Sequence, residues 1–252
     1  MKRFADGYRF GTFEVNGAVF PRVMMGTSPF TGAGYFLDKA YAYQQQFLQQ
    51  PQNMTRLMVE AIQNGCNAFQ ILAHPPILQA LEMAIERTAT EVFLCATVGF
   101  TDVRTELDEL KLFTPQSILT DAAFTDKNLI GIGRFLSAIR EKAPKALIGI
   151  STNTPGTVLD RAAEIDAIQV IMTPVNRNGS FMRPSQEEAM TGMNRARKMG
   201  KTLIGMQVLA AGELRPEEAF PYVKDKVDAI AVGLTSTIEI TETLRSARKA
   251  FC

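Results

Sequence analysis

Short apolar runs recur along the sequence from residue 22 onward, and segments with helical spacing of apolar residues separate them. The runs show little polar alternation, which is typical of parallel strands buried on both faces. Eight are expected to be strands: residues 22–28, 67–73, 91–99, 117–124, 146–152, 167–175, 202–210 and 229–235. Eight strand–helix units in a chain of 252 residues predict an α/β fold, a (β/α)8 TIM barrel. The alternative is a doubly wound sheet, whose first turn usually carries GxGxxG; the turn after residues 22–28 lacks this spacing.

The helices between these strands are expected where apolar residues recur at positions i, i+3, i+4 and i+7. The clearest segments are residues 54–65, 75–88, 128–143, 184–200 and 236–251. Residues 75–88 begin with two prolines, and residues 54–65 end with a glycine. Proline is favoured in the first turn of a helix, and glycine is favoured just after its last turn. The whole chain, residues 1–252, is therefore interpreted as one domain.

Two additions to the barrel are predicted. Residues 1–21 contain Asn16-Gly17 between alternating segments, which predicts an N-terminal β-hairpin that closes the N-terminal mouth of the barrel. Residues 29–53 form a helical insertion after the first strand, over the end where barrel active sites lie. The glycine-rich stretch 25–36 lacks the spacing of a phosphate-binding loop. We interpret it as the hinge of a lid that turns Phe30, Tyr35 and Phe36 toward a ligand.

Composition excludes several classes of partner. A net charge of +1 gives no basic excess for nucleic acid, and the apolar runs are too short for a membrane helix. The N-terminus lacks the apolar segment of a signal peptide, and three cysteines without a CxxC motif indicate a reduced, cytoplasmic protein. A single histidine leaves no zinc site built on several imidazoles, so no metal is expected. The expected partner is a small molecule, anionic in one interpretation, and the sequence carries no signal for an oligomeric state.

Two titratable side chains stand near expected strand ends, where a barrel carries its chemistry. His74 directly follows residues 67–73 and is suited to proton transfer near neutral pH. The alternative interpretation is that His74 is a polar residue that precedes a helix and has no chemical role. Asp121 lies within an apolar run, so it is either a catalytic acid or a structural partner of Arg134 or Arg140. Asp126 is interpreted as a helix N-cap.

The loops after the seventh and eighth strands contain small residues that allow close approach of a ligand. In TIM barrels these loops commonly bind phosphate, and a helix N-terminus favours an anion. The predicted anion-binding or cofactor-binding residues there are Gly212, Thr235, Ser236 and Thr237. The alternative is that these residues only cap the last helix. Polar or aromatic side chains near strand ends give the predicted substrate-binding residues Ser28, Phe30, Thr97, Asn176 and Gln207.

Several stretches, in the same order along the chain, resemble the aldo-keto reductase superfamily. They are "RVMMGTSPF", "AIQNGCNAF", "VFLCATVGF", "IGISTNTPGTVLDRAAEIDAIQVIMTPVNR", "RARKMGKTLIGMQVLAAGELRPEEAF" and "DAIAVGLTSTIEITETL". The resemblance implies a TIM barrel that uses NADP, with Ser151 and Asn153 at the family's serine-asparagine pair and Gln169 under the nicotinamide. The family's catalytic aspartate, tyrosine, lysine and histidine fall around residues 70–72, His74, Thr97 and residues 124–125, and none is retained.

Three functions remain open from the sequence. The first is an NAD(P)H-dependent oxidoreductase with a non-standard proton donor, either His74 or a tyrosine of the insertion (Tyr35, Tyr41 or Tyr43). The second is a lyase or isomerase that acts on a small phosphorylated or carboxylated metabolite, with Asp121 or His74 as acid and base. The third is a non-catalytic binding protein on an enzyme scaffold. Convergent polar groups in a deep cavity would disfavour the third, and side chains that close the anion site would disfavour the second.

Overall fold

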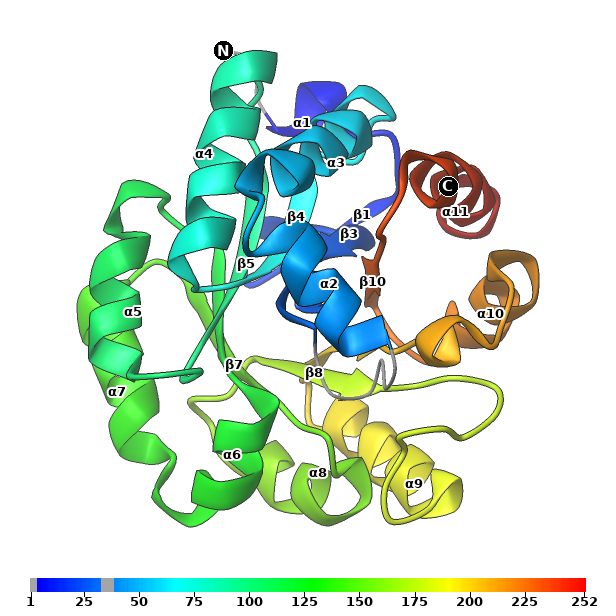
Figure 1. The fold of residues 1–252 in the computed structure, drawn as a ribbon. Coiled ribbons are helices and arrows are strands. Elements are labelled where there is room, and N and C mark those ends of the chain that lie inside the picture. The colour runs from blue at the N-terminus through cyan, green and yellow to red at the C-terminus, as the bar shows by residue number, and fades with distance from the viewer. Residues whose placement is uncertain (1–3, 33–38) are drawn as a thin grey trace.

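The computed structural model describes residues 4–32 and 39–252, and its eight parallel strands close into a barrel (Figure 1). The strands are β3 (Val23–Gly26), β4 (Ala68–Leu72), β5 (Phe93–Val98), β6 (Ser117–Thr120), β7 (Leu147–Ser151), β8 (Val170–Pro174), β9 (Thr202–Met206) and β10 (Ala229–Gly233). Strand β10 pairs with both β9 and β3, which closes the ring. The predicted (β/α)8 TIM barrel is confirmed. Tyr35, with Gly34 and Phe36, lies outside the described residues.

The strands are apolar on both faces because each face has its own core. In β4, Phe69 and Ile71 belong to the large outer core between the barrel and its helices, whereas Ala68 belongs to the inner core. In β5, Leu94 and Ala96 face outward, and Phe93 and Cys95 face inward. This alternation places every second residue of a strand on the barrel axis, so the last inward-facing residues of the strands lie at the C-terminal mouth.

In Figure 1 the helices lie around the barrel, except for α2, which lies in front of its strands. They are α1 (Phe4–Gly7), α2 (Ala40–Phe47), α3 (Pro51–Gln63), α4 (Pro75–Thr88), α5 (Val103–Glu109), α6 (Ala122–Asn128), α7 (Gly133–Lys142), α8 (Pro155–Ala163), α9 (Gln186–Lys198), α10 (Pro216–Val223) and α11 (Thr237–Phe251). Prolines in the first turns of α3, α4, α8 and α10 suit positions whose N–H groups have no partner within the helix.

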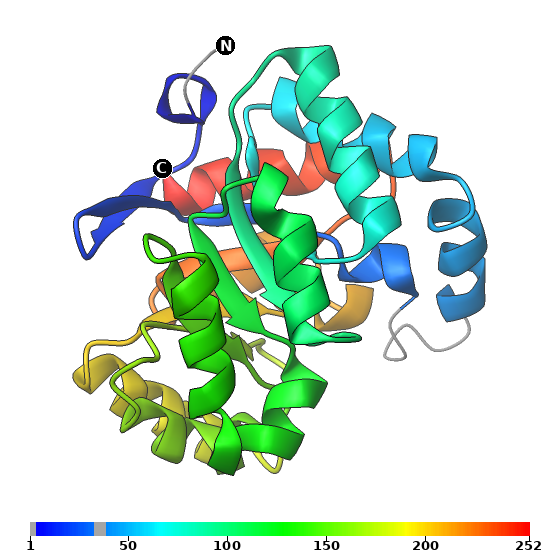
Figure 2. The same ribbon diagram turned by 90° about the vertical axis from the view of Figure 1, so that its left-hand side faces the viewer.

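The predicted hairpin is present. Strands β1 (Thr12–Val15) and β2 (Ala18–Pro21) pair antiparallel around Asn16 and Gly17, which both have positive φ. Phe20 of β2 is fully buried and packs edge-on against Phe93 of β5, with 4.8 Å between ring centroids. The hairpin therefore completes the inner core at the N-terminal end of the barrel. Figure 2 shows the hairpin and α2 at opposite ends of the barrel.

The expected strand 117–124 is wrong in its second half. Strand β6 ends at Thr120, and Asp121 is the N-cap of α6, where its carboxylate accepts hydrogen bonds from the backbone of Ala123 and Phe124. Asp126 is then a residue within α6 rather than an N-cap. Apolarity alone does not distinguish a short strand from the first turn of the helix that follows it.

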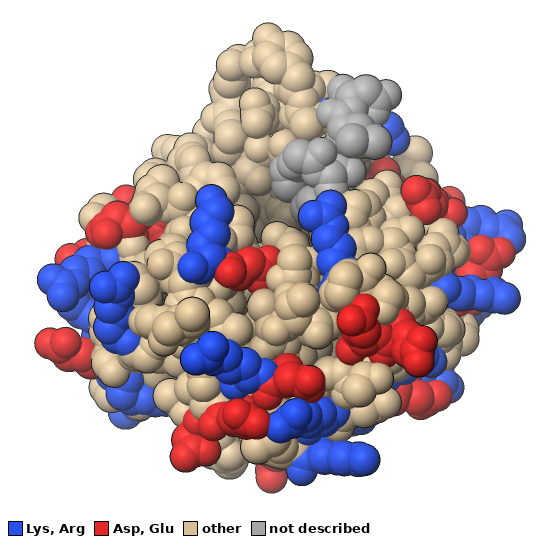
Figure 3. Space-filling model, turned by 90° about the horizontal axis from the view of Figure 1, so that it is seen from below, with Lys and Arg blue, Asp and Glu red and all other residues tan. Residues whose placement is uncertain are grey.

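The insertion after β3 begins with a 3-10 helix, Ser28–Thr31, and contains α2, as expected from its composition. Pro51 opens α3, the first outer helix of the barrel. Within the described residues, none of the helices is both long and apolar enough to cross a membrane. On the face in Figure 3, basic and acidic side chains are interspersed over the surface and form no patch of a single sign.

Candidate functional site

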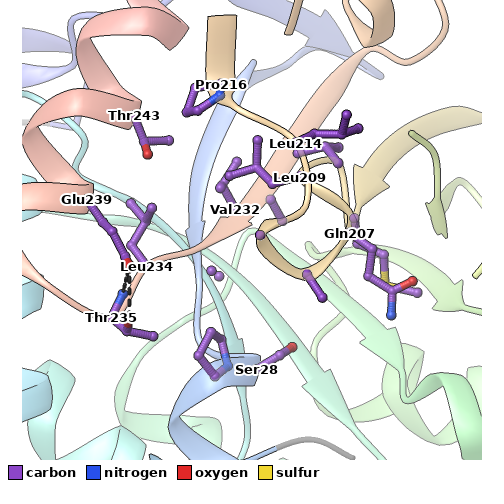
Figure 4. A pocket seen from close by; sticks show the side chains of 18 of the residues that line it. Ser28, Gln207, Leu209, Leu214, Pro216, Val232, Leu234, Thr235, Glu239 and Thr243 are labelled. Carbon is purple, nitrogen blue, oxygen red and sulfur yellow. Dashed lines mark hydrogen bonds between the residues drawn. The ribbon is translucent and has the colours of Figure 1, made fainter. Parts of the chain in front are cut away.

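A cavity of about 510 Å³ opens at the C-terminal mouth of the barrel, between the loop after β9 and the start of α11 (Figure 4). Its volume lies within the range of roughly 300–1,000 Å³ that is usual for small-molecule sites. Residues at the inner end come from the barrel strands: Gly26, Gln70, Met172, Met206, Ala231 and Gly233. The outer end is lined by residues of the β9 loop, the start of α10 and the first two turns of α11.

The inner end of the cavity is uncharged. The Nε2 atom of Gln70 donates a hydrogen bond of 3.0 Å to Oγ1 of Thr97, and both side chains are buried. Gly233 is required here because a Cβ at this position would come within 2.5 Å of Cγ of Pro29. The inner end therefore presents one fixed amide between apolar walls, as suits an uncharged polar group of a ligand.

The loop after β9 is conformationally strained. Three of its residues other than glycine have left-handed backbones: Gln207 (φ 54°), Ala210 (φ 49°) and Ala211 (φ 58°). Such conformations cost roughly 1–2 kcal/mol per residue and concentrate at ligand sites. Asn176, fully buried, supports the loop by donating from Nδ2 to the carbonyl of Gln207 at 3.2 Å. Gln207 also lines the cavity, and its buried Oε1 atom has no hydrogen-bond donor among the residues that the structure describes.

The start of α11 is capped by its own side chains. Ser236 is the N-cap and accepts from the backbone N–H of Glu239 at 3.2 Å. In return, Oε2 of Glu239 accepts from both the backbone N–H and the hydroxyl of Thr235, at 2.8 and 2.9 Å (dashed in Figure 4). A carboxylate thus occupies the place where an anion was expected to bind. This corrects the anion interpretation of Thr235, Ser236 and Thr237 in favour of helix capping.

Helix α2 of the insertion contributes a tyrosine to the cavity. Tyr43 and Lys39 both line it, and their four-residue spacing places them on one face of the helix. Tyr41, two residues before Tyr43, is 71% exposed and is not among the lining residues. Of the three tyrosines considered as proton donors, Tyr43 is therefore the one that faces the cavity, while Tyr35 lies outside the described residues.

The charges around the cavity balance. Its lining contains the three cations Lys39, Arg215 and Arg245, and the three carboxylates Glu217, Glu239 and Glu242. Arg215 is already engaged by Glu218 at 2.8 Å, in a pair that lies largely in solvent. The described lining therefore carries no net charge, because its cations and carboxylates are equal in number.

His74 lies outside this cavity. It is the residue before α4, and its ring packs edge-on against Phe100 with 5.9 Å between centroids. Its Nδ1 atom is buried and has no hydrogen-bond partner within residues 4–32 and 39–252. Of the predicted site residues, the cavity lining includes Ser28, Gln207, Gly212 and Thr235.

Asp121 also lies outside the cavity lining, and its N-cap bonds account for its carboxylate. Burial raises the pKa of Asp121, and the nearby Glu106 carboxylate raises it further, against the lowering effect of the backbone N–H donors. Neither of its expected arginine partners is needed to explain its position. The interpretation as a catalytic acid in an apolar strand is therefore replaced by that of a helix cap.

Gln169 lies at the wrong end of the barrel for a cofactor contact. It precedes β8, and its Oε1 atom accepts from the backbone of Ile148 and from Arg140, at 3.0 and 3.1 Å. Phe30 is likewise absent from the cavity lining, because its fully buried ring packs on Phe47. Asn176 acts on the cavity only through the β9 loop described above.

The residues at the end of β7 lie beside the mouth but outside the lining. Ser151 is buried, and its hydroxyl has no hydrogen-bond partner in the described part of the chain. The backbone N–H of Asn153 donates to Asp126 at 3.1 Å. Asp126 also accepts from the hydroxyl of Thr152, at 2.6 Å. This pair of bonds fixes the turn after β7 against α6. Thr97 contributes indirectly by holding Gln70.

The charged lining residues that the sequence analysis missed are Lys39, Arg215, Glu217, Glu242 and Arg245. A signal existed for two of them, because Glu239, Glu242 and Arg245 recur every three residues, a spacing that keeps them near one face of the last helix. Among the described residues, no group of three His, Cys, Asp or Glu side chains could hold a metal ion.

No protein family and no curated protein matches the sequence. Among solved structures, a candidate aldo-keto reductase from Pseudomonas aeruginosa is 16% identical, with a TM-score of 0.68 and 95% of each chain covered. An aldo/keto reductase from Brucella melitensis is 12% identical (TM-score 0.65; 93% of this chain and 92% of that one). The aldo-keto reductase AKR11C1 from Bacillus halodurans, in its holo form, is 14% identical (TM-score 0.62; 94% and 90%). The chain therefore has the fold of the aldo-keto reductases.

Proposed function

We propose that the protein is an NAD(P)H-dependent oxidoreductase that reduces a carbonyl compound within the cavity. The observation that carries this proposal is the extent of the cavity, which reaches from Gln70 in the barrel to Arg245 on α11. Along α11 alone, the lining residues from Glu239 to Arg245 span about 9 Å, at 1.5 Å per residue. An elongated site with a neutral inner end and a charged outer end suits a dinucleotide whose reactive ring lies at the barrel axis.

The donors and acceptors of the cavity fit such a cofactor. The unpartnered, buried Oε1 atom of Gln207 is an acceptor suited to the amide hydrogens of a nicotinamide. Arg245 supplies positive charge for a pyrophosphate. The holo aldo-keto reductase of the same fold supports the same assignment by analogy.

When bound, the cofactor would supply hydride to the carbonyl carbon. The chain must then supply a proton, and we assign this role to the hydroxyl of Tyr43, which faces the cavity from α2. Lys39, one helical turn earlier, adds positive charge close to the oxygen on which negative charge develops. Gln70, fixed by Thr97, orients the substrate, and Met172 and Met206 exclude water from the axis. Tyr43 is preferred to His74 because His74 does not line the cavity.

The alternative lyase or isomerase would need a free anion site at the start of α11. Glu239 occupies that position through its two bonds to Thr235, which disfavours this alternative. A non-catalytic role is disfavoured by the strained loop and the unpartnered Gln207 oxygen in the cavity wall.

The proposal is tested by titrating the protein with NADH and NADPH and following nicotinamide fluorescence. The chain contains no tryptophan, so energy transfer from indole does not complicate the signal. Saturable binding should also raise the free energy of unfolding, by about 2.7 kcal/mol at a ligand concentration of 100 Kd. The proposed function is rejected if neither dinucleotide changes the fluorescence or the stability at millimolar concentration.

The proton donor is tested by Tyr43→Phe, with Tyr41→Phe on the same helix as the matched control. Using methylglyoxal and 4-nitrobenzaldehyde as probe substrates, we expect Tyr43→Phe to lower kcat by roughly 10²–10⁴-fold, the usual contribution of a general acid. Cofactor affinity should change little in either variant, and Tyr41→Phe should retain full activity. Equal activity in both variants would remove Tyr43 from the mechanism.

A further inference from the structure

The loop after β9 is held at two consecutive residues by the loop after β8. Pro174 and Met206 form the last pair of the two strands, and the backbone N–H of Val175 then donates to the carbonyl of Met206 at 3.1 Å. The next carbonyl, that of Gln207, accepts from Nδ2 of Asn176 at 3.2 Å. The side chain of Asn176 therefore continues the contact between the two strands beyond the point where both have ended.

Asn176 is fixed tightly because both polar atoms of its side chain are bonded. The side chain is fully buried, and its Nδ2 atom also donates to the carbonyl of Ser180 at 2.7 Å. Its Oδ1 atom accepts from the backbone N–H of Ser180 at 3.0 Å. These two bonds orient the amide group, which has a second hydrogen on Nδ2 for Gln207. The backbone carbonyl of Asn176 accepts in turn from Nε2 of Gln186 on α9, at 3.3 Å.

The residue that Asn176 holds is a strained one in the cavity wall. The left-handed backbone of Gln207 (φ 54°) is unfavourable for a residue other than glycine, so it persists only where neighbouring contacts fix it. Two donors fix its carbonyl, the N–H of Ala210 at 2.9 Å and the side chain of Asn176. Because the backbone conformation limits the rotamers of a side chain, these bonds also limit where the Oε1 acceptor of Gln207 lies. That acceptor is buried and has no donor within the described residues, so its position suits a donor from a ligand.

We propose that Asn176 is a positioning residue for ligand binding, which fixes the backbone of Gln207 and thereby places the Oε1 acceptor for an N–H or O–H group of the ligand. The inference rests on the proposed function. Asn176 is not among the described lining residues, so it acts through Gln207 and not by contact with the ligand. Its effect should therefore appear in affinity, and only while residue 207 carries its amide. A purely structural role of Asn176 would lower stability without such coupling.

Asn67 provides a matched control at the other end of the barrel. It is 1% exposed, and its Nδ2 atom likewise donates to two backbone carbonyls, those of Phe4 and Glu91, at 2.9 and 3.0 Å. It directly precedes β4, so it lies at the N-terminal end of that strand, opposite the mouth where the cavity opens. Alanine at either asparagine removes the same kind of bonds from a buried site. The two variants should therefore lose stability to a similar extent.

The experiment is a double-mutant cycle that combines urea unfolding with fluorescence titrations of NADH and NADPH. The proteins are the wild type, Asn67→Ala, Asn176→Ala, Gln207→Ala and the double variant Asn176→Ala/Gln207→Ala. We expect Asn176→Ala to raise the Kd of the dinucleotide that the wild type binds by about three- to tenfold, the contribution of one hydrogen bond. Asn67→Ala should leave this Kd within about twofold of the wild type. In the Gln207→Ala background, Asn176→Ala should change Kd by less than about twofold, because the acceptor is already absent.

The opposite results separate the inference from the proposed function. An Asn176→Ala protein that binds as tightly as the wild type overturns the inference. Losses that multiply in the double variant also overturn it, because Asn176 would then affect binding without Gln207. Equal losses of affinity in Asn67→Ala and Asn176→Ala overturn it as well, since both would then reflect general destabilisation. Absence of dinucleotide binding by the wild type rejects the proposed function and the inference with it, whereas the other results leave that function standing.

A second variant decides the matter if Asn176→Ala does not fold. Gln186→Leu removes the donor to the Asn176 carbonyl from a partly buried position and keeps the asparagine itself. It also removes the bond from Nε2 of Gln186 to the hydroxyl of Tyr222, which is 3.0 Å long. We expect Gln186→Leu to raise Kd by about two- to threefold when Gln207 is present, and to leave it unchanged in Gln207→Ala. Unchanged affinity in Gln186→Leu alone would overturn the inference.

Discussion

The carboxylate of Asp121 caps α6 from a partly buried position, and two opposing effects act on it. Its bonds to the N–H groups of Ala123 and Phe124 favour the ionised form, but burial outweighs them and raises its pKa above the usual 3.8. The native state therefore retains this proton to higher pH than the unfolded state does. By linkage, the contribution of Asp121 to stability is largest below pH 3.8 and is lost as pH rises through the folded pKa.

We therefore predict that Asp121→Asn is at least as stable as the wild type at pH 7. Asparagine keeps the capping oxygen without the charge, and its advantage should shrink as pH falls toward 4, where the wild-type carboxyl becomes protonated. Urea unfolding at a series of pH values measures this difference.

Asp121→Ala is the contrasting variant, and it should lose about 1 kcal/mol at pH 7 because it removes the cap. If Asp121→Asn were the less stable variant, the balance between burial and hydrogen bonding would be opposite to the one described. Loss of dinucleotide binding in a folded Asp121→Asn protein would reopen its role in the site.

At the scale of elements, the loop after β9 decides the shape of the cavity. Gly212 ends its 3-10 turn with φ at 97°, and a Cβ built there meets no atom within 4 Å. Gly200, after α9, is its matched counterpart, with φ at 78° and equally open surroundings. Alanine at either glycine should therefore destabilise the fold through the backbone alone, by about 1–2 kcal/mol.

The two glycine variants should differ in ligand binding. We predict that Gly212→Ala weakens dinucleotide binding as well as stability, because Gly212 lines the cavity, whereas Gly200→Ala lowers stability alone. Urea unfolding and a fluorescence titration of each variant measure the two effects. Equal affinities in the two variants would show that the loop backbone around Gly212 does not shape the binding site.

At the scale of the whole molecule, the barrel divides its three thiols into two classes. Cys66 and Cys95 are fully buried, and burial raises the pKa of each thiol to about 12. Cys252 is exposed at the C-terminus. Because the thiolate is the reactive form, a disulfide reagent at pH 8 should modify one thiol in the folded protein and three in denaturant.

The reaction is followed by the release of the chromophoric thiol, and Cys252→Ser should leave no fast-reacting group. The two slow thiols then report global unfolding, since both lie within the closed barrel and its helices. More than one fast-reacting thiol in the native wild type would mean that the barrel opens readily near Cys66 or Cys95.

The barrel could be predicted because its signals are local. A strand buried on both faces requires a continuous apolar run, and an outer helix requires one apolar stripe, so eight such pairs indicate a closed α/β barrel. Asn16-Gly17 gave the hairpin for the same reason, since a type I′ turn needs two residues that tolerate positive φ. The exact end of β6 could not be read, because Thr120 and the residues after Asp121 are similarly apolar or neutral.

The site depended on tertiary structure. Ser28, Gln207, Gly212 and Thr235 were predicted from their positions near strand ends, but among the described strands the cavity is lined by β3, β4, β8, β9 and β10 and not by β5, β6 or β7. His74 follows β4 and Asp121 follows β6, and neither residue lines the cavity. Tyr43 is one of three tyrosines in the insertion after the first strand, and only the orientation of α2 distinguishes it from Tyr41.

The sequence by itself determined the fold class, the order of the elements and the turns, because these follow from the periodicity and backbone preferences of neighbouring residues. The tertiary structure decided which polar residues share the cavity, which of them are consumed by capping, and what charge the cavity carries. Those properties depend on distances between residues far apart in the chain, such as Gln70, Tyr43 and Glu242. No local pattern encodes such distances, since closure of the barrel sets them.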